Sequence, residues 1–272
     1  KMKVDGTNFS VLHHFGSIPN DVGGGKSNII YYNGVLYGSS YYGGSIWDVF
    51  GNFKCGYIYK LNSNGSNYSF VHEFDSNNSA NPHECIVLTN NKLYGRYDIT
   101  AGNLPNKIYF YNVLSNNYAC PIGTFTFANT GIRGITANQT NVYCLGYVPG
   151  ASSILIKKIN AINSTQANVY DFVSTPTQLV IKDNLALNGQ FLYGSCNSGI
   201  SRIDTLGQNF SLISNYIINN KLIFLGNVAY GVSYNTTYPN GFIFKIDLLT
   251  VGLNKNASNV SKNEIEFFPN PT

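Results

Sequence analysis

A short motif recurs along this chain at a nearly regular interval, and the repetition limits the possible folds more than any other feature of the sequence. The motif consists of an apolar residue, a tyrosine and a small residue. It occurs at residues 36–38, 93–95, 142–144, 192–194 and 229–231. Its tyrosines are at positions 37, 94, 143, 193 and 230, so they are separated by 57, 49, 50 and 37 residues. Intervals of this size are typical of four-stranded units repeated side by side.

Other segments recur in step with the motif. Apolar segments precede it at residues 28–32, 85–88 and 222–225 and predict a first strand. Asn33-Gly34 and Asn188-Gly189 predict two-residue hairpin turns after that strand, because both central residues of such a turn need a positive φ. Asn90-Asn91 has the equivalent position in the second unit. Alternating patterns predict third strands at residues 56–61, 107–111, 154–159 and 242–246, and fourth strands at residues 8–15, 68–74 and 168–172.

The fold class follows from these units. Hydrophobic residues make up 43% of the sequence, which is enough for a core and argues against disorder. Four short antiparallel strands cannot bury both of their faces alone, so each unit must be covered by its neighbours. The sequence therefore predicts an all-β chain, a β-propeller of about five four-stranded antiparallel blades, either as a complete ring or as part of a larger one.

The two ends of the chain depart from the repeat. Residues 1–250 are expected to form the propeller, residues 251–263 a linker rich in Asn, Ser and Lys, and residues 264–272 the start of another domain. The fourth strand at residues 8–15 could pair with the last blade to close a ring, or it could belong to an earlier blade. Residues 1–15 repeat the layout of residues 60–74, which favours the second alternative and a chain that is cut at both ends.

Composition narrows the range of partners. The net charge is +4 and charged residues make up only 11% of the chain, without the dense basic stripe of a nucleic-acid-binding protein. No apolar run reaches the roughly 18 residues of a transmembrane segment, so no membrane span is expected. A weakly charged surface of Ser, Thr and Asn fits a protein outside the cell that meets sugars or other proteins. The five cysteines form no C-x-x-C pair and are expected to be small buried residues.

Two resemblances support this setting. Asp5, Gly6, Asn8, Phe9, Leu12 and Phe15, together with the Leu-Tyr-Gly motif and the following Tyr42-Gly43-Gly44, resemble the GloVer tandem repeat. That resemblance implies a propeller on secreted or surface-anchored bacterial proteins and no established activity. Pro269, Asn270, Pro271 and Thr272 resemble the opening of a type IX secretion C-terminal sorting domain. This second resemblance implies recognition by the secretion machinery and release or display at the outer surface of a Gram-negative bacterium.

Residues with metal-binding or catalytic chemistry are scattered. His83, Glu84 and Cys85 have no second ligand cluster at a suitable spacing, and the adjacent His13 and His14 point to opposite faces of an extended segment. No G-x-S-x-G motif occurs, and most of the thirteen acidic residues are isolated. The sequence therefore predicts no metal site, no cofactor and no catalytic residue.

The best candidates for ligand binding follow the second strand of the first two units. The loop of the first unit carries Tyr42 and Trp47, and the second unit has Arg96 and Tyr97 at the same place. Aromatic residues and Arg dominate binding hot spots, although large aromatics also pack between blades. We expect a non-catalytic module that binds glycan or protein. A secreted carbohydrate-active enzyme, a lyase or a glycosidase, and a structural spacer are the alternatives.

Overall fold

The computed structural model is all-β and has no α-helix among the residues that it describes. These are residues 1–3, 5–21, 27–48, 50–75, 80–98, 107–119, 132–147, 154–172, 180–181, 183–215, 218, 221–233, 241–249 and 268–269. The predicted linker at residues 251–263 and three residues of the predicted sorting motif, Asn270, Pro271 and Thr272, lie outside this set. Within it, no helix is long and apolar enough to cross a bilayer.

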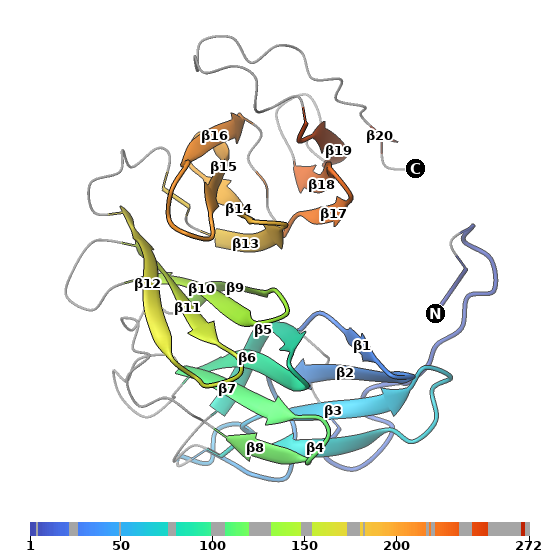
Figure 1. Ribbon diagram of the computed structural model, residues 1–272. Coiled ribbons are helices and arrows are strands. Elements are labelled where there is room, and N and C mark those ends of the chain that lie inside the picture. The colour runs from blue at the N-terminus through green and yellow to red at the C-terminus, as the bar shows by residue number, and fades with distance from the viewer. Residues whose placement is uncertain are drawn as a thin grey trace. The chain divides into compact units, whose positions relative to one another are not determined.

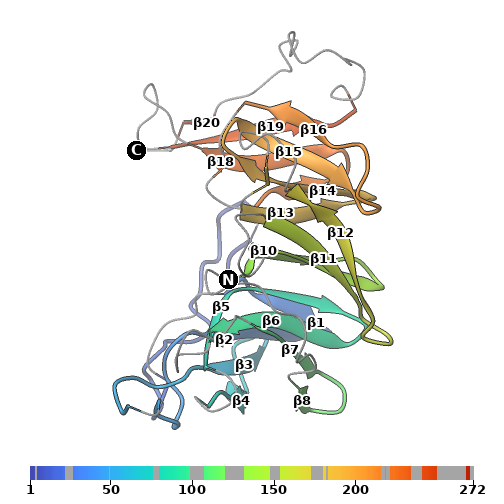
Figure 2. The same cartoon turned by 90° about the vertical axis from the view of Figure 1, so that its left-hand side faces the viewer.

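The described strands form five sheets, which we call blades 1 to 5 (Figures 1 and 2). Blade 1 has β1 (Ile30–Tyr32), β2 (Val35–Ser40), β3 (Tyr57–Asn62) and β4 (Ser69–Glu73). Blade 2 has β5 (Ala80–Thr89), β6 (Lys92–Asp98), β7 (Lys107–Asn112) and β8 (Asn117–Ala119). Blade 3 has β9 (Ile132–Ala137), β10 (Asn141–Tyr147), β11 (Ile154–Asn160) and β12 (Gln166–Asp171). Blade 4 has β13 (Asp183–Asn188), β14 (Phe191–Cys196), β15 (Gly199–Asp204) and β16 (Ser211–Ser214). Blade 5 has β17 (Ile223–Leu225), β18 (Val228–Ser233), β19 (Phe242–Asp247) and β20 (Phe268–Pro269).

Each blade is an antiparallel meander whose strands pair in chain order, as the repeat predicted. The predicted turns at Asn33-Gly34 and Asn90-Asn91 are confirmed, since all four residues have positive φ, from 47° to 84°. The third predicted turn is displaced by one residue. Asn188 pairs with Phe191, so Gly189 and the following residue are the central positions. A glycine with a φ of 57° at the first central position suits a turn of the type II′ class.

Four strands of blades 4 and 5 were not located from the sequence, namely β13, β15 and β16 in blade 4 and β20 in blade 5. Strands β15 and β16 were not predicted, because the two-residue connection from β14 to β15 leaves no polar loop that would mark where one strand ends. In blade 5 the fourth position is occupied by β20, where Phe268 pairs with Ile243 and Pro269 pairs with Phe242. Pro269 of the predicted sorting motif therefore lies in this strand.

An aromatic ring lies over the glycine of the motif in three of the five blades. The cross-strand pairs are Gly38 with Tyr59, Gly95 with Tyr109, and Gly231 with Phe244. A Cβ atom on any of these glycines would lie within 3 Å of ring carbons, for example 2.7 Å from Cε1 of Tyr109. The missing side chain therefore makes room for the neighbouring ring, which explains why the motif ends in glycine in these blades.

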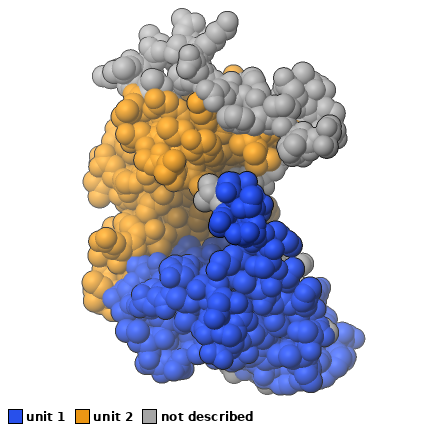
Figure 3. All heavy atoms as spheres, turned by 90° about the vertical axis from the view of Figure 1, so that its right-hand side faces the viewer, with its two compact units in different colours: residues 1–131 blue, residues 132–272 orange. Residues whose placement is uncertain are grey.

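The described residues group into two compact units, residues 1–131 and residues 132–272 (Figure 3). In the first unit one core lies between blades 1 and 2 and contains Tyr37, Ile58, Phe74, Ile86, Leu93, Tyr97, Tyr109 and Tyr111. In the second unit one core joins blades 3 and 4 through Leu145, Ile156, Phe172, Leu185 and Leu192. Another core of that unit joins blades 4 and 5 through Tyr193, Ile200, Ala229, Phe242 and Phe244. Three cysteines, Cys55, Cys144 and Cys196, form no disulfide bond and are buried, and their burial was predicted.

The N-terminal segment does not form the strand that was predicted at residues 8–15. It does form the turn that joins the third and fourth strands elsewhere. In residues 3–8, 62–67 and 204–209, the first N–H donates to the fifth carbonyl and the fourth N–H donates to the first carbonyl, at 2.8–3.0 Å. In all three turns the fourth residue is a glycine and the sixth an asparagine, both with positive φ. Beyond Ser10, whose N–H donates to the carbonyl of Lys1, no described strand pairs with the segment.

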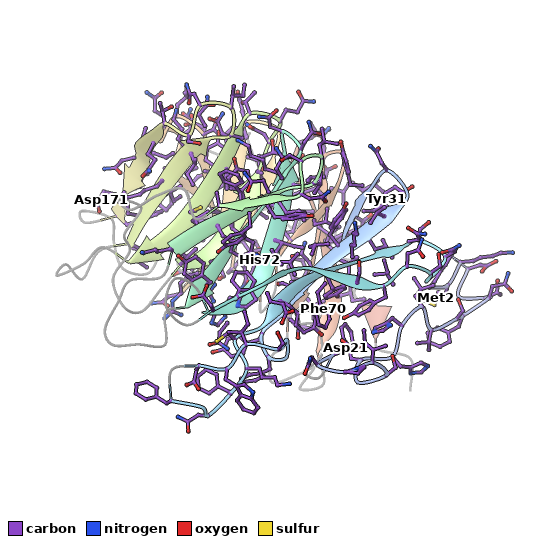
Figure 4. The ribbon with its side chains drawn as sticks, turned by 90° about the horizontal axis from the view of Figure 1, so that it is seen from below. Met2, Asp21, Tyr31, Phe70, His72 and Asp171 are labelled. Carbon is purple, nitrogen blue, oxygen red and sulfur yellow. The ribbon has the colours of Figure 1, made fainter. Side chains whose placement is uncertain are left out.

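Side-chain packing gives this segment the role of a fourth strand all the same. Its rings contact blade 1 as the rings of β4 contact blade 2. The matching contacts are the stacks of His13 on Tyr68 and of His72 on Tyr118, both at 3.5 Å and 9°, and the edge contacts of Phe15 with Tyr59 at 5.5 Å and of Phe74 with Tyr109 at 5.2 Å. The segment thus covers one part of the face of blade 1, whereas Tyr31 on β1 is left 65% exposed (Figure 4).

Candidate functional site

The four predicted ligand-binding residues have different environments. Tyr42 and Trp47 lie in the loop from β2 to β3 and are 44% and 53% exposed. Arg96 on β6 is half-buried, and its Nη2 lies 3.0 Å from Nδ1 of His83. Tyr97 is fully buried in the core between blades 1 and 2. Leu93, Gly95 and Tyr97 alternate along β6 and so share one face of the sheet. The ring of Tyr97 therefore supports the core instead of offering a binding surface.

The loop from β2 to β3 is the longest such connection among the five blades, and part of it folds as a two-stranded projection. We call residues 46–55 the finger; Val49 lies outside the described residues. Trp47 and Lys54 form a β-bridge. On either side of this bridge, the N–H of Asp48 donates to the carbonyl of Phe53 at 2.9 Å and the N–H of Cys55 donates to the carbonyl of Ile46 at 3.0 Å.

The tip of the finger is held by Asp48. Its Oδ1 accepts hydrogen bonds from the backbone N–H groups of Asn52 at 2.6 Å and Phe53 at 3.3 Å, and its carbonyl accepts one from Gly51 at 3.0 Å. Aspartate commonly organises tight turns in this way. Gly51 supplies the positive φ of 70° that lets the chain reverse.

Apolar side chains on the finger are exposed to solvent. Ile46 is 38%, Trp47 53% and Phe50 68% exposed, and Tyr42 at the base is 44% exposed. The ammonium group of Lys54 lies 5.5 Å from the Trp47 ring, within the range of a cation–π contact. Phe50 belonged to the loop noted in the sequence, but the exposure of Ile46 could not be foreseen, because an isoleucine in a loop gives no signal of its own.

The base of the loop is fixed to blades 1 and 2. Asn81 binds it twice, through its N–H to the carbonyl of Cys55 at 2.7 Å and through its side-chain amide to the carbonyl of Tyr41 at 2.9 Å. The side chain of Lys54 donates to Oδ1 of Asn20 at 2.7 Å. Glu73 at the end of β4 accepts a hydrogen bond from the N–H of Ser45. Since β4, β5 and the N-terminal segment all anchor the loop, the finger projects from a fixed base.

A chain of aromatic contacts links this base to Arg96. Tyr42 meets Tyr41 edge-on at 4.6 Å, and Tyr41 meets His83 edge-on at 5.1 Å. His83 in turn contacts the guanidinium of Arg96. The structure therefore brings Tyr42 and Arg96 into one network through His83, a residue that the sequence analysis had considered only as a metal ligand.

No family model and no curated protein matches this chain. Solved structures do. A chain of the nidogen/laminin complex is similar with a TM-score of 0.56 and 10% identity, over 80% of this chain and 73% of that chain. One of two prolyl endopeptidases has a TM-score of 0.56 and 13% identity, over 86% of this chain and 33% of its own. TolB from Acinetobacter baumannii has a TM-score of 0.51 and 12% identity, over 79% of this chain and 49% of its own.

These structures contain β-propellers. The fold of this chain is a β-propeller. It spans about a third of the endopeptidase chain and about half of the TolB chain. Because one fold hosts many functions, a likeness at 10–13% identity supports the architecture and no particular activity.

The propeller also contains a buried polar cluster at the N-terminal segment. Asp21 has no exposed surface, and its Oδ1 accepts hydrogen bonds from the hydroxyls of Tyr57 at 2.6 Å and Tyr68 at 2.7 Å. Its Oδ2 lies 2.5 Å from Nε2 of His13. Burial above all, with the hydrogen bonds to Asp21 adding to it, raises the pKa of both tyrosines well above the ordinary value. The hydroxyls therefore remain protonated donors, and the cluster clamps the segment to blade 1.

Replacing this carboxylate is expected to loosen the N-terminal segment without unfolding the blades. Asp21→Asn keeps an oxygen that can accept from Tyr57 and Tyr68, but it removes the charge that strengthens all three contacts. We expect the free energy that holds the segment on blade 1 to fall by about 1 kcal/mol. Cleavage by a protease between residues 15 and 27 should therefore be faster. Limited proteolysis with mass spectrometry checks this result, and unchanged cleavage rates at these sites would contradict it.

Metal-binding groups do not gather in the part of the chain that the structure describes. No set of three His, Cys, Asp or Glu side chains lies close enough there to hold an ion. His13 instead contacts Asp21, and His83 contacts Arg96. The side chains of Glu84 and Cys85, which the sequence placed beside His83, lie outside the described set.

Proposed function

We propose that this propeller is a non-catalytic recognition module and that the finger of blade 1 binds a protein partner. The observation that carries the proposal is the exposure of Tyr42, Ile46, Trp47 and Phe50 on one anchored loop. Exposed aromatic residues on a fixed base suit recognition, because little conformational entropy is lost when they are buried by a partner. Tryptophan and tyrosine are also the residues that most often dominate the energy of protein interfaces.

The polar atoms around the finger favour a protein over a glycan. Sugars are recognised through hydrogen bonds to their hydroxyl groups as well as through ring stacking. Here Oδ1 of Asp48 already accepts two backbone N–H groups, and the ammonium of Lys54 already donates to Asn20. Ile46 and Phe50 add purely apolar surface beside Trp47. Such a surface is buried more favourably by apolar side chains of a partner.

We further propose that the module works outside the cell, at the outer surface of a Gram-negative bacterium. Three features support this location: the low content of charged residues, the resemblance of the repeat to GloVer proteins, and the Pro-Asn-Pro-Thr sequence at residues 269–272. In this proposal the C-terminal residues are recognised by the type IX secretion machinery, and the propeller is the part that meets the partner.

Removing the finger's apolar side chains should weaken binding strongly and leave the fold intact. In the double variant W47A/F50A we expect affinity for the protein partner to fall about 30-fold or more, the effect of losing a hot spot. The matched control is L114A/L206A, because Leu114 and Leu206 are 63% and 75% exposed on turns of other blades. The measurement is binding to an array of purified extracellular and cell-surface proteins, followed by biolayer interferometry on the proteins that bind.

The same preparations should be applied to a glycan array and to a reducing-sugar release assay. If the native chain binds a saccharide and W47A/F50A does not, the ligand of the finger is a glycan and not a protein. Turnover of a polysaccharide that a single carboxylate-to-amide change abolishes would replace the recognition module by an enzyme. If W47A/F50A still binds the protein partner with native affinity, the finger is not the binding site.

A further inference from the structure

A cavity in the second unit has the features of a small-ligand site. It has a volume of about 300 Å³ and lies where blades 4 and 5 meet. Its wall is formed by the turn from β13 to β14, by Asn227 in the turn from β17 to β18, and by Leu248 and Leu249 after β19. Pockets for small organic ligands begin at about this size, roughly 300 Å³.

Hydrogen bonds between backbone and side chains hold the wall of the cavity in place. The side-chain amide of Asn188 donates to the carbonyl of Gly226 at 3.0 Å and so joins the first turns of blades 4 and 5. The N–H of Leu248 donates to the carbonyl of Asn227 at 2.8 Å, and the N–H of Thr205 donates to the carbonyl of Gln190 at 2.8 Å. The cavity is therefore a preformed feature of the two blades.

Arg202 is the cationic group of this cavity. Its guanidinium lies 4.6 Å from the centroid of the Phe191 ring, and its Nε donates to Oγ of Ser211 at 3.2 Å. Tyr193 is its cross-strand neighbour. Burial raises the pKa of Tyr193, and the hydrogen bond and charge of Arg202 lower it in part. These contacts fix the plane of the guanidinium.

No carboxylate pairs with Arg202 in the described part of the chain. Two strands that reach the cavity, β15 and β19, end in the acidic residues Asp204 and Asp247. Asp204 uses its carboxylate to accept hydrogen bonds from Leu206, Gln208 and Asn209, and Asp247 accepts one from Leu249. The positive charge of Arg202 is therefore left for an anion that enters the cavity.

The basic residue opposite the motif tyrosine is an arginine in this blade and a lysine in three others. Lys60, Lys158 and Lys245 have this position opposite Tyr37, Tyr143 and Tyr230. Only arginine presents a planar pair of donors that matches a carboxylate with two parallel hydrogen bonds. Arginine replaces lysine at this position in blade 4, where the side chain lines the cavity. This replacement suits recognition of a carboxylate.

We propose that this cavity binds a uronic acid, a six-carbon sugar that carries a carboxylate. The guanidinium of Arg202 binds the carboxylate, the side-chain amides of Asn188, Gln190 and Asn227 bind hydroxyl groups, and Phe191 and Leu248 contact the apolar face of the sugar ring. One uronic acid unit fits the volume of the cavity. The site lies on other blades than the finger and does not depend on the function proposed for it.

The test is a titration of the whole chain with glucuronate and galacturonate by isothermal calorimetry, with glucose, galactose and acetate as comparison ligands. We expect both uronates to bind. The neutral sugars should bind at least about 10-fold more weakly because they lose the charged hydrogen bond to Arg202, and acetate at least about 10-fold more weakly because it lacks the hydroxyl groups and the ring. Arg202→Gln should weaken uronate binding about 10- to 100-fold. Arg202→Lys should weaken it by a smaller factor, because the charge remains and the paired donors are lost.

Lys245→Gln is the matched control, since it removes the same charge from the equivalent position of blade 5. It should leave uronate affinity unchanged. Thermal unfolding confirms that each variant folds, and Arg202→Lys carries the test if Arg202→Gln does not fold. No uronate binding at tens of millimolar, equal binding of the neutral sugars, or full binding by both Arg202 variants would each overturn the proposal.

Discussion

Gly95→Ala should destabilise the first unit by about 3 kcal/mol or more, because the new methyl group has no space. Its Cβ would lie 2.7 Å from Cε1 of Tyr109 and nearer still to Cζ and the hydroxyl oxygen. Tyr109 cannot move aside easily, since it is fully buried against Phe74 and Tyr97. Equilibrium unfolding in guanidinium chloride, followed by the fluorescence of Trp47, the only tryptophan of the chain, measures the effect.

A double-mutant cycle isolates the contact. In a Tyr109→Ala background the ring is gone, so Gly95→Ala should cost much less than it costs in the native chain. Tyr109→Phe provides no such relief, because Cζ of the ring stays in place. Equal costs of Gly95→Ala in both backgrounds would show that the glycine is needed for another reason.

Acid should destabilise the first unit through His72. Burial lowers the pKa of His72 to about 4, and the negative charges of Asp75 and Glu73 offset this only in part. Its buried Nε2 has no hydrogen-bond partner among the described residues, and its ring stacks on Tyr118. The neutral imidazole is therefore the form that the native state accepts.

The sign of the pH dependence follows. The folded pKa is below the ordinary value of 6.5, so the unfolded chain binds the proton more readily. The contribution of neutral His72 to the free energy of unfolding is fully present above about pH 6.5 and is lost as the pH falls toward about 4. The whole change corresponds to about 3 kcal/mol. Unfolding free energies of the native chain and His72→Phe between pH 7 and pH 4 measure it.

His72→Phe keeps an aromatic ring at the stack and removes the titrating group, so its stability should change much less over this range. The control His14→Gln removes an exposed histidine and should follow the native chain. A native chain and a His72→Phe variant that lose stability in parallel would assign the acid sensitivity to other groups.

The sequence was sufficient for the blades because the repeat is visible in side-chain types that the fold requires. The Leu-Tyr-Gly motif marks the second strand, since the tyrosine enters a core and the glycine makes room for a ring from the third strand. The repeat is harder to recognise in the sequence where the glycine of the motif does not face an aromatic residue of the third strand. Blade 4 pairs Gly194 with Ser201, and without an aromatic residue β15 had no recognisable pattern. Residues 8–15 have the pattern of a strand, but pairing depends on a neighbouring strand that the local sequence cannot specify.

The candidate site was only partly predictable. Tyr42 and Trp47 stood out because aromatic residues in a long polar loop are unusual. Tyr97 was chosen for its residue type without regard to its position, and its burial was missed, although alternation with Leu93 and Gly95 places it on the core side of β6. The cavity at Arg202 was not predicted at all, since its wall comes from the turns of two blades that are distant in sequence.

The contacts of the fourth strands bear on how this protein can be divided. His72 and Phe74 are hydrogen-bonded into one sheet, yet their rings are buried by the next one, and Tyr170 and Phe172 meet Phe210 of blade 4 in the same manner. The cooperative folding unit is therefore offset from the sheet by one strand. A fragment that is cut at the sheet boundary would lose the lid of its own core, whereas one that begins at Ser69 would retain it for blade 2.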